Sequence, residues 1–241
     1  MQPLTAVYLE WLLGTFVVSY LVGSIPFAYA IVKMVTGEDI TAHGTGNVGS
    51  MNVRRTTGSW WWFAVAVLGD GLKGLVPALI AKLMVGGSIG MAMQPWGVTL
   101  ASVNSLWWTN PVFYVPMAAV AGSVLGHNYS IWMALIEERF ARTGKGLATG
   151  AGALLAYDWR YFAIVIVVAL AVIALTRYMM AGQVAAAFAL PAAALALRSP
   201  DWPFTAVMGS VVYLAHHKRF VGLIQGREPK LYINDGIGPR G

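Results

Sequence analysis

The residues with the clearest chemical potential lie between positions 43 and 55, in the stretch HGTGNVGSMNVRR. Its glycines let consecutive backbone N–H groups point into one concavity, and its Thr, Asn and Ser side chains can add hydrogen bonds. Two arginines follow, and a guanidinium binds a phosphate or a carboxylate through two parallel hydrogen bonds. The stretch therefore predicts an anion-binding loop. The alternative is a glycine-rich turn between two membrane helices, with its arginines at the lipid headgroups.

Two further segments place polar residues inside apolar stretches. In Gly23-Ser24-Ile25-Pro26 the proline allows a kink and leaves a carbonyl group without its helical donor, and the Ser24 hydroxyl can partly satisfy that carbonyl. The alternative to a functional role is a packing kink. Asp70 and Lys73 are three residues apart and share a helix face; because each is costly alone in lipid, we expect them to pair or to face a polar interior. A structural ion pair and a site beside a bound phosphate are both compatible with this spacing.

Three more candidates lie where apolar stretches begin or end. His127 closes one stretch, and a lone histidine there is more often a cap or a hydrogen-bond link than a catalyst. Lys145 lies between two glycines at the start of the next stretch, where helix N–H groups, the helix dipole and the ammonium group together favour an anion. The alternative is an ordinary cytoplasmic lysine. His216 and His217 are adjacent and do not share a helix face, so we expect no two-histidine metal site, although one of them could move a proton.

The composition indicates which elements must position these residues. Hydrophobic residues make up 58% of the 241 residues and charged residues only 11%, which is typical of an all-α polytopic membrane protein. The chain has no cysteine, which excludes a thiol nucleophile, disulfides and cysteine-bound metals. We treat 1–241 as a single integral-membrane domain in which 86–109 is ambiguous between an interfacial hairpin, a re-entrant piece and an eighth span. The predicted spans are roughly 8–33, 59–85, 110–127, 146–157, 160–176, 183–199 and 203–216.

The distribution of basic residues predicts the orientation. With seven spans, most Lys and Arg residues fall on one side, which the positive-inside rule makes cytoplasmic. The N-terminus is then outside and the C-terminus inside, with 217–241 as a basic cytoplasmic tail. The net charge of +6 is thus first a topology signal rather than a nucleic-acid signal, and it also suits anionic lipids and substrates. The predicted cytoplasmic segments are 34–58, 128–145, 177–182 and the residues after 216.

Together the motifs form an ordered set over about residues 20–231: G-S-I-P, G-T-G-N-x-G-x-x-N-V-x-R, D-x-x-K-G, G-H, G-K-G-x-A-T, and H-H with G-x-E-x-K. This set resembles the PlsY-type acyl-phosphate:glycerol-3-phosphate acyltransferases. The resemblance implies a seven-helix, multi-pass enzyme of the bacterial inner membrane, with its active site facing the cytoplasm. It would transfer an acyl group from acyl phosphate to the 1-hydroxyl of glycerol 3-phosphate, giving lysophosphatidic acid in the first step of phospholipid synthesis. Membrane lipids would surround it, and no cofactor, metal or nucleic acid would be needed.

The resemblance also assigns residues. It implies catalytic roles for His216, Lys145 and Arg55, whereas Arg54 fills a position that the family leaves variable and is expected to point toward headgroups. The family usually has polar Thr, Ser and Asn where this chain has Met51, Met180 and Arg219, so these positions bear on substrate and activity. The substrate- or phosphate-binding residues that it implies are Ser24, Thr45, Gly46, Asn47, Gly49, Asn52, Arg55, Lys73, His127 and Lys145.

The expected chemistry is direct transfer. An acyl phosphate is already activated, so the enzyme has to bind two anions, orient a hydroxyl group and stabilise developing charge. Either His216 or a phosphate oxygen of the substrate would take the hydroxyl proton, while Arg55 and Lys145 hold phosphates. The alternatives are an enzyme of the same fold with a different acceptor, and a lipid or organic-anion transporter. A transporter often shows paired halves with broken helices in corresponding places, and we see no such pairing in the sequence.

Overall fold

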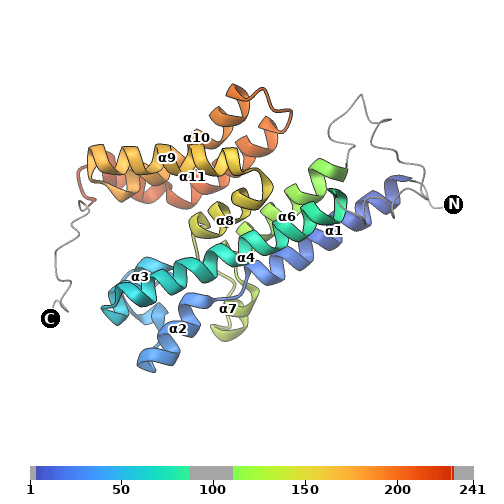
Figure 1. Ribbon diagram of the computed structural model, residues 1–241. Coiled ribbons are helices and arrows are strands. Elements are labelled where there is room, and N and C mark those ends of the chain that lie inside the picture. Colours follow the sequence, from blue (N-terminus) through green and yellow to red (C-terminus); the bar gives the residue numbers. More distant parts are fainter. Residues whose placement is uncertain (1–3, 87–110, 229, 231–241) are drawn as a thin grey trace. The chain divides into compact units, whose positions relative to one another are not determined.

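The computed structural model describes residues 4–86, 111–228 and 230 (Figure 1). All regular structure in these ranges is helical, which confirms the predicted all-α class. The prediction for 86–109 lies, beyond Gly86, outside the described residues. The elements are α1 (Leu4–Gly23), α2 (Phe27–Thr36), the 3₁₀ turn η1 (Ile40–Ala42), α3 (Ser50–Thr57), α4 (Trp60–Gly86), α6 (Pro111–Asn128), α7 (Ile131–Ile136), α8 (Leu147–Tyr157), α9 (Trp159–Thr176), α10 (Met179–Ala196) and α11 (Trp202–Ile224).

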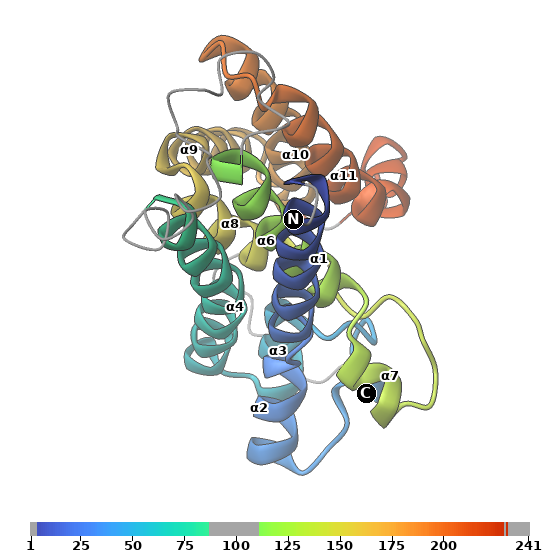
Figure 2. The ribbon, with the colours of Figure 1, turned by 90° about the vertical axis from the view of Figure 1, so that its right-hand side faces the viewer.

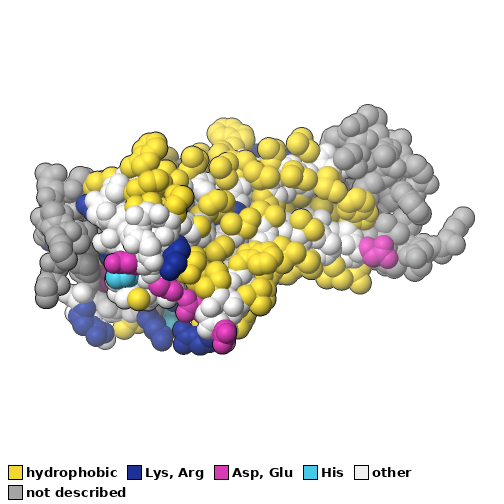
Figure 3. Space-filling view, turned by 90° about the horizontal axis from the view of Figure 1, so that it is seen from below, with side chains coloured by type: hydrophobic (Ala, Val, Ile, Leu, Met, Phe, Trp, Pro, Cys, Tyr) yellow, Lys and Arg dark blue, Asp and Glu magenta, His cyan; other side chains and the backbone are white. Residues whose placement is uncertain are grey.

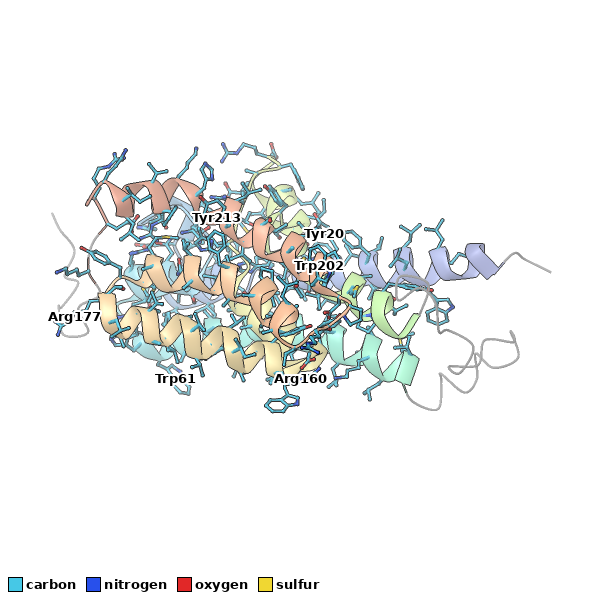
Figure 4. All side chains as sticks on the ribbon, turned by 90° about the horizontal axis from the view of Figure 1, so that it is seen from above. Tyr20, Trp61, Arg160, Arg177, Trp202 and Tyr213 are labelled. Carbon is cyan, nitrogen blue, oxygen red and sulfur yellow. The ribbon has the colours of Figure 1, made fainter. Side chains whose placement is uncertain are left out.

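Helices occur at every range predicted as a span, but they differ in their capacity to cross a bilayer. Four stretches of the described chain are long and apolar enough: Leu9–Thr36, Trp60–Val85, Trp159–Thr176 and Met179–Ala196. The helix α8 is shorter than the roughly 20 residues that a crossing needs. Much of the surface visible in Figure 3 is hydrophobic, and Figure 4 shows Trp61, which is 70% exposed, pointing away from α4. The count of seven crossings stays a prediction.

The first span is broken as its Gly-Ser-Ile-Pro sequence predicts. Helix α1 ends at Gly23 and α2 begins at Phe27, with Pro26 at its N-cap position. Both the backbone N–H and the hydroxyl group of Ser24 donate to the carbonyl of Tyr20, at 2.9 and 2.7 Å. The Ser24 hydroxyl therefore bonds within the last turn of α1, to a carbonyl that already accepts its own N–H. The Val22 carbonyl, four residues before Pro26, accepts the Ile25 N–H at 3.1 Å instead.

The described chain forms two compact units, and it passes from the first to the second at this break. The first unit contains Met1–Ile25 and Gly69–Trp159, and the second contains Pro26–Leu68 and Arg160–Gly241. In the first unit, glycines bring helix backbones together, as in many membrane bundles. A Cβ atom on Gly126 of α6 would lie 2.2 Å from the Tyr20 carbonyl oxygen of α1. A Cβ atom on Gly74 of α4 would lie 1.9 Å from the Thr149 carbonyl oxygen of α8.

In the second unit, α2, η1 and α3 pack together, and α9, α10 and α11 lie side by side (Figures 1 and 2). A Cβ atom on Gly209 of α11 would lie 2.4 Å from the Ala187 carbonyl oxygen of α10. The last span was predicted to end at 216, and α11 continues beyond that position to Ile224. Residues 217–224 contain no proline, and the chain leaves the helix only near Gly226, where φ is +68°. The first part of the predicted basic tail is therefore helical.

Candidate active site

The anion-binding loop predicted at 43–55 is organised by the side chain of Asn52. This side chain is 1% exposed, and its amide group donates to the carbonyls of Ile40 at 3.1 Å and His43 at 3.0 Å. Its oxygen accepts the backbone N–H of Thr45 at 3.3 Å. Asn52 thus spends both amide hydrogens and its oxygen inside the protein, holding the loop closed on the first turns of α3. This geometry suits a residue that shapes the loop.

The glycines of the loop are required by its backbone. Gly44 and Gly46 have φ of +57° and +65°, a region that disfavours side chains. A Cβ atom on Gly44 would also lie 2.2 Å from the Asn52 side-chain oxygen. Thr45 and Gly46 are exposed, and Asn47 is partly exposed. Two left-handed glycines flanking an exposed threonine form a turn whose outer surface is open to a ligand, as a loop that binds anions needs.

The two arginines of the motif have different surroundings. Arg54 is 8% exposed; it donates to the Gly58 carbonyl at 2.9 Å and lies over the ring of Trp60 at 4.6 Å. The expectation that Arg54 points toward headgroups is therefore wrong, because its guanidinium caps the C-terminus of α3 and packs on an aromatic ring. Arg55 is partly exposed, and within the described residues its guanidinium makes no hydrogen bond or ion pair. Only Arg55 keeps its donors for a ligand.

Arg55 belongs to a group of charges in the second unit. Arg219 of α11 binds the carboxylate of Glu228 through two hydrogen bonds, at 2.9 and 2.5 Å. Burial and the charge of Arg219 lower the pKa of Arg55, while Glu228 partly raises it again. An arginine stays charged through such a shift, so the site presents two guanidinium groups and one carboxylate. Arg219, one of the three departures from the family pattern, is thus neutralised by Glu228; Met180, another, is buried on α10.

His216 and His217 lie on different faces of α11, as predicted from their adjacency. His216 is 1% exposed, whereas His217 is exposed. The His216 Nδ1 atom lies 2.7 Å from the Val212 carbonyl oxygen. A carbonyl only accepts, so Nδ1 carries the hydrogen, and Nε2 of the neutral ring carries the lone pair. The tautomer of His216 is therefore set by its own helix.

In the first unit, Lys73 and Asp70 pair as their spacing predicts. The Lys73 Nζ atom lies 2.8 Å from Asp70 Oδ1, and each side chain is 3% exposed. The same ammonium group donates to the Ile25 carbonyl at 2.9 Å, at the break after α1. The neighbouring carbonyl of Ser24 accepts the hydroxyl of Ser130 at 2.5 Å. The two carbonyls exposed by the break are thus taken by a lysine and a serine that are far away in the sequence, and Lys73 has little capacity left for a substrate.

His127 lies next to this pair, at the predicted end of α6. It is 7% exposed, and its Nδ1 atom is 3.6 Å from Asp70 Oδ1. A Cβ atom on Gly144 would lie 2.3 Å from the His127 ring, so only glycine lets the following loop pass so close. Thr143 donates to the His127 carbonyl at 3.1 Å. His127 therefore connects the Asp70 pair to the Gly-Lys-Gly turn.

That turn starts α8 and resembles an anion site in its own right. Gly146 is the N-cap residue with φ of +76°, and Lys145 beside it is partly exposed. Two buried polar atoms, Asn128 Oδ1 and Thr149 Oγ1, have no hydrogen-bond partner within the described residues. A helix N-terminus with a neighbouring lysine and unsatisfied polar groups favours a bound anion.

The predicted residues are divided between the two units. The loop at 43–49, Arg55 and His216 belong to the second unit, and Ser24, Lys73, His127 and Lys145 belong to the first. No group of His, Asp and Glu residues in the described chain could hold a metal ion. Sequence reasoning missed Ser130, although a serine directly before the apolar run Ile131–Ile136 is an N-cap signal, and its oxygen accepts the Met133 N–H at 3.1 Å. Thr149 is the last residue of the G-K-G-x-A-T motif, but sequence reasoning gave its hydroxyl, which is buried in the structure, no role of its own.

Comparison with known proteins agrees with the motifs. Residues 13–226 match the family profile of glycerol-3-phosphate acyltransferase. The glycerol-3-phosphate acyltransferase of Syntrophomonas wolfei is 32% identical over 89% of this chain and 94% of its own length. The enzyme of the same name from Thermosynechococcus vestitus is 33% identical over 91% of this chain and 94% of its own length.

A solved structure shows the same fold. The crystal structure of PlsY, an integral membrane glycerol 3-phosphate acyltransferase, in its glycerol 3-phosphate form, aligns with a TM-score of 0.71. It is 26% identical and covers 92% of this chain and 96% of its own. The resemblance drawn from the motifs is thereby confirmed. The chain belongs to the glycerol-3-phosphate acyltransferase family, and it is an integral membrane acyltransferase whose described elements are all helical.

Proposed function

We propose that this protein transfers an acyl group from acyl phosphate to the 1-hydroxyl of glycerol 3-phosphate, at the cytoplasmic face of a bacterial inner membrane. The observation that carries the proposal is the presence of two anion-capable loops. One is the glycine turn at 43–49 with Arg55, and the other is the Gly-Lys-Gly turn that starts α8. The reaction brings together two phosphates, one on each substrate, so it needs two such places.

The bond changes are those of a direct transfer. The glycerol hydroxyl oxygen attacks the acyl carbon, and the bond between that carbon and the phosphate oxygen breaks. Inorganic phosphate leaves, and the acyl group remains on glycerol 3-phosphate. The hydroxyl proton passes to a base. Phosphate is a good leaving group, so the contribution of the enzyme is to hold both anions, orient the hydroxyl and stabilise charge on the departing phosphate. We assign that holding to Arg55 and Lys145.

His216 is our candidate base. Its Nδ1–H bond to the Val212 carbonyl leaves Nε2 as the atom able to accept a proton. A phosphate oxygen of either substrate is the alternative acceptor. The roles of the predicted ligands divide accordingly. Thr45, Gly46 and Asn47 present the outer surface of the loop, and Asn52 shapes its backbone. Ser24 and Lys73 instead shape the break after α1. His127 connects the Asp70–Lys73 ion pair to the Gly-Lys-Gly turn.

The deciding experiment uses purified protein with palmitoyl phosphate and glycerol 3-phosphate, and detects lysophosphatidic acid by mass spectrometry. Phosphate release should match lysophosphatidic acid formed, with no requirement for coenzyme A and no loss on adding a chelator. Activity with palmitoyl-coenzyme A alone would refute the proposed donor. Turnover with another alcohol but not with glycerol 3-phosphate would show that the acceptor is a different molecule. Transport of either anion without any product would show that the protein is a transporter.

A further inference from the structure

The segment between α6 and α8 presents an apolar surface that the proposed catalysis does not use. Around α7, the large hydrophobic side chains that face outward are Tyr129, Trp132, Leu135, Ile136 and Phe140, of which Leu135 is 66% and Phe140 63% exposed. Only Met133 of this helix turns inward and is buried. A soluble loop of a dozen residues rarely exposes so many large apolar groups together, so a surface of this kind marks an interaction.

This segment is held firmly against the end of α1. The Tyr20 hydroxyl donates to the Tyr129 carbonyl at 2.6 Å, and the Trp132 indole N–H donates to the Leu21 carbonyl at 3.1 Å. The Ser130 hydroxyl donates to the Ser24 carbonyl at 2.5 Å. Figure 2 shows α7 beside the end of α1, where the helix breaks. The exposed apolar residues are therefore displayed in a defined position.

The part of α1 that holds this segment belongs to a helix long and apolar enough to cross a membrane. Helix α1 belongs to the candidate span Leu9–Thr36. At 1.5 Å per residue, Leu21 lies about 18 Å along the helix from Leu9, whereas the hydrocarbon core is about 30 Å thick. Leu21 and Ile25 are themselves outward-facing, at 40% and 39% exposed, so the apolar surface of α7 continues the lipid-facing surface of α1.

The residue types of the segment fit a bilayer interface. Trp and Tyr concentrate where headgroups meet acyl chains, because their rings are apolar and their N–H and O–H groups are polar. The indole N–H of Trp132 donates to a backbone carbonyl of α1, and the hydroxyl of Tyr20 on α1 donates to a backbone carbonyl of the segment. Directly after α7 come Glu137, Glu138 and Arg139, all exposed, which would lie at the headgroups. An apolar helix followed by charges is the pattern of an element that lies in the membrane surface without crossing it.

We propose that α7 and its flanks, residues 129–140, form a membrane-embedded hook whose apolar side chains are covered by the acyl chains and headgroups of the surrounding lipid. The hook lies alongside the break in the first span. Ser130, the N-cap residue of α7, also donates to the Ser24 carbonyl. The same hydroxyl group therefore holds both the start of α7 and the backbone at the break.

The absence of cysteine from the sequence allows a direct test. Leu135→Cys carries a nitroxide spin label in the purified full-length protein, reconstituted into vesicles of phosphatidylethanolamine and phosphatidylglycerol. The matched variant is Arg139→Cys, four residues away and also exposed. Val167→Cys, exposed within the candidate span Trp159–Thr176, provides the lipid reference. Collision of each label with oxygen, which partitions into lipid, is compared with collision with a water-soluble nickel chelate.

The label at Leu135 should collide with oxygen much more than with the nickel chelate, as at Val167, and should report a depth of about 5–10 Å below the headgroups. The label at Arg139 should favour the nickel chelate. Equal, nickel-accessible signals at 135 and 139 would show that α7 lies in water and would overturn the proposal. Protection of Leu135 from both reagents would also overturn it, because it would mean that protein, such as a second copy of the chain, covers the surface. All three variants should retain activity, since none alters a buried side chain.

Discussion

Replacing Lys73 by methionine tests whether this lysine serves the fold or the substrate. Its ammonium group is 2.8 Å from Asp70 Oδ1 and 2.9 Å from the Ile25 carbonyl oxygen, and both charged side chains are almost fully buried. In Lys73→Met the Asp70 carboxylate stays inside the helix bundle, and among the described residues its remaining charge partner is His127, at 3.6 Å. The Ile25 carbonyl loses its donor at the same time. We therefore expect the substitution to lower the stability of the protein while leaving its affinity for substrate nearly unchanged.

The magnitude follows from the two interactions. Breaking a buried ion pair from one side costs about 3–5 kcal/mol, and an unsatisfied carbonyl adds about 1 kcal/mol. For a chain of this size 1 kcal/mol corresponds to roughly 2–4 °C in Tm, so Lys73→Met should melt about 8–24 °C lower. The double variant Asp70→Asn with Lys73→Met removes both charges, and it should recover most of the loss apart from the carbonyl bond.

The assay is thermal unfolding in detergent, followed by the intrinsic fluorescence of the ten tryptophans, together with steady-state kinetics well below either Tm. The KM for glycerol 3-phosphate should stay near the wild-type value in both variants. An unchanged Tm with a large rise in that KM would show that Lys73 binds substrate, which would refute the structural reading. A double variant as unstable as Lys73→Met would refute the ion pair as the source of the loss.

Three further predictions concern the second unit and the topology. Asn52→Asp places a carboxylate oxygen against two carbonyls at 3.0–3.1 Å, so two hydrogen bonds of about 1.5 kcal/mol each are lost and kcat/KM should fall about 100-fold. Activity within a few-fold of wild type would contradict the role of Asn52 in shaping the loop. Arg55→Lys loses the two-pronged contact and should cut kcat/KM about 10- to 100-fold, whereas Arg177→Lys, exposed and pointing away from the ribbon in Figure 4, should not; equal losses would place the phosphate elsewhere. Cysteines at Ser50 and Ser199 should react with an impermeant maleimide from opposite sides of the membrane, and reaction of both from one side would exclude the seven-span topology.

Much of the chemistry was readable from the sequence because it depends on local patterns. Positive-φ glycines, an i, i+3 ion pair, a proline break and a glycine at the start of a helix are all set by neighbouring residues, and each occurs where its motif predicts. The family was equally readable, since an ordered set of motifs over nearly the whole chain is far more specific than any one of them. The adjacency of His216 and His217 was enough to place them on different faces of one helix.

Only the tertiary structure decided what these polar groups are used for. Asn47 and Asn52 look alike in the motif. In the structure the Asn52 amide donates to carbonyls up to twelve residues away, whereas Asn47 is partly exposed. Arg54 and Arg55 are adjacent, but one caps its helix over Trp60 while the other retains its donors. Lys73 finds the Ile25 carbonyl forty-eight residues away. The physical reason is that a hydrogen-bonding group inside a membrane protein must find a partner wherever packing brings one, and packing depends on contacts that no local pattern encodes.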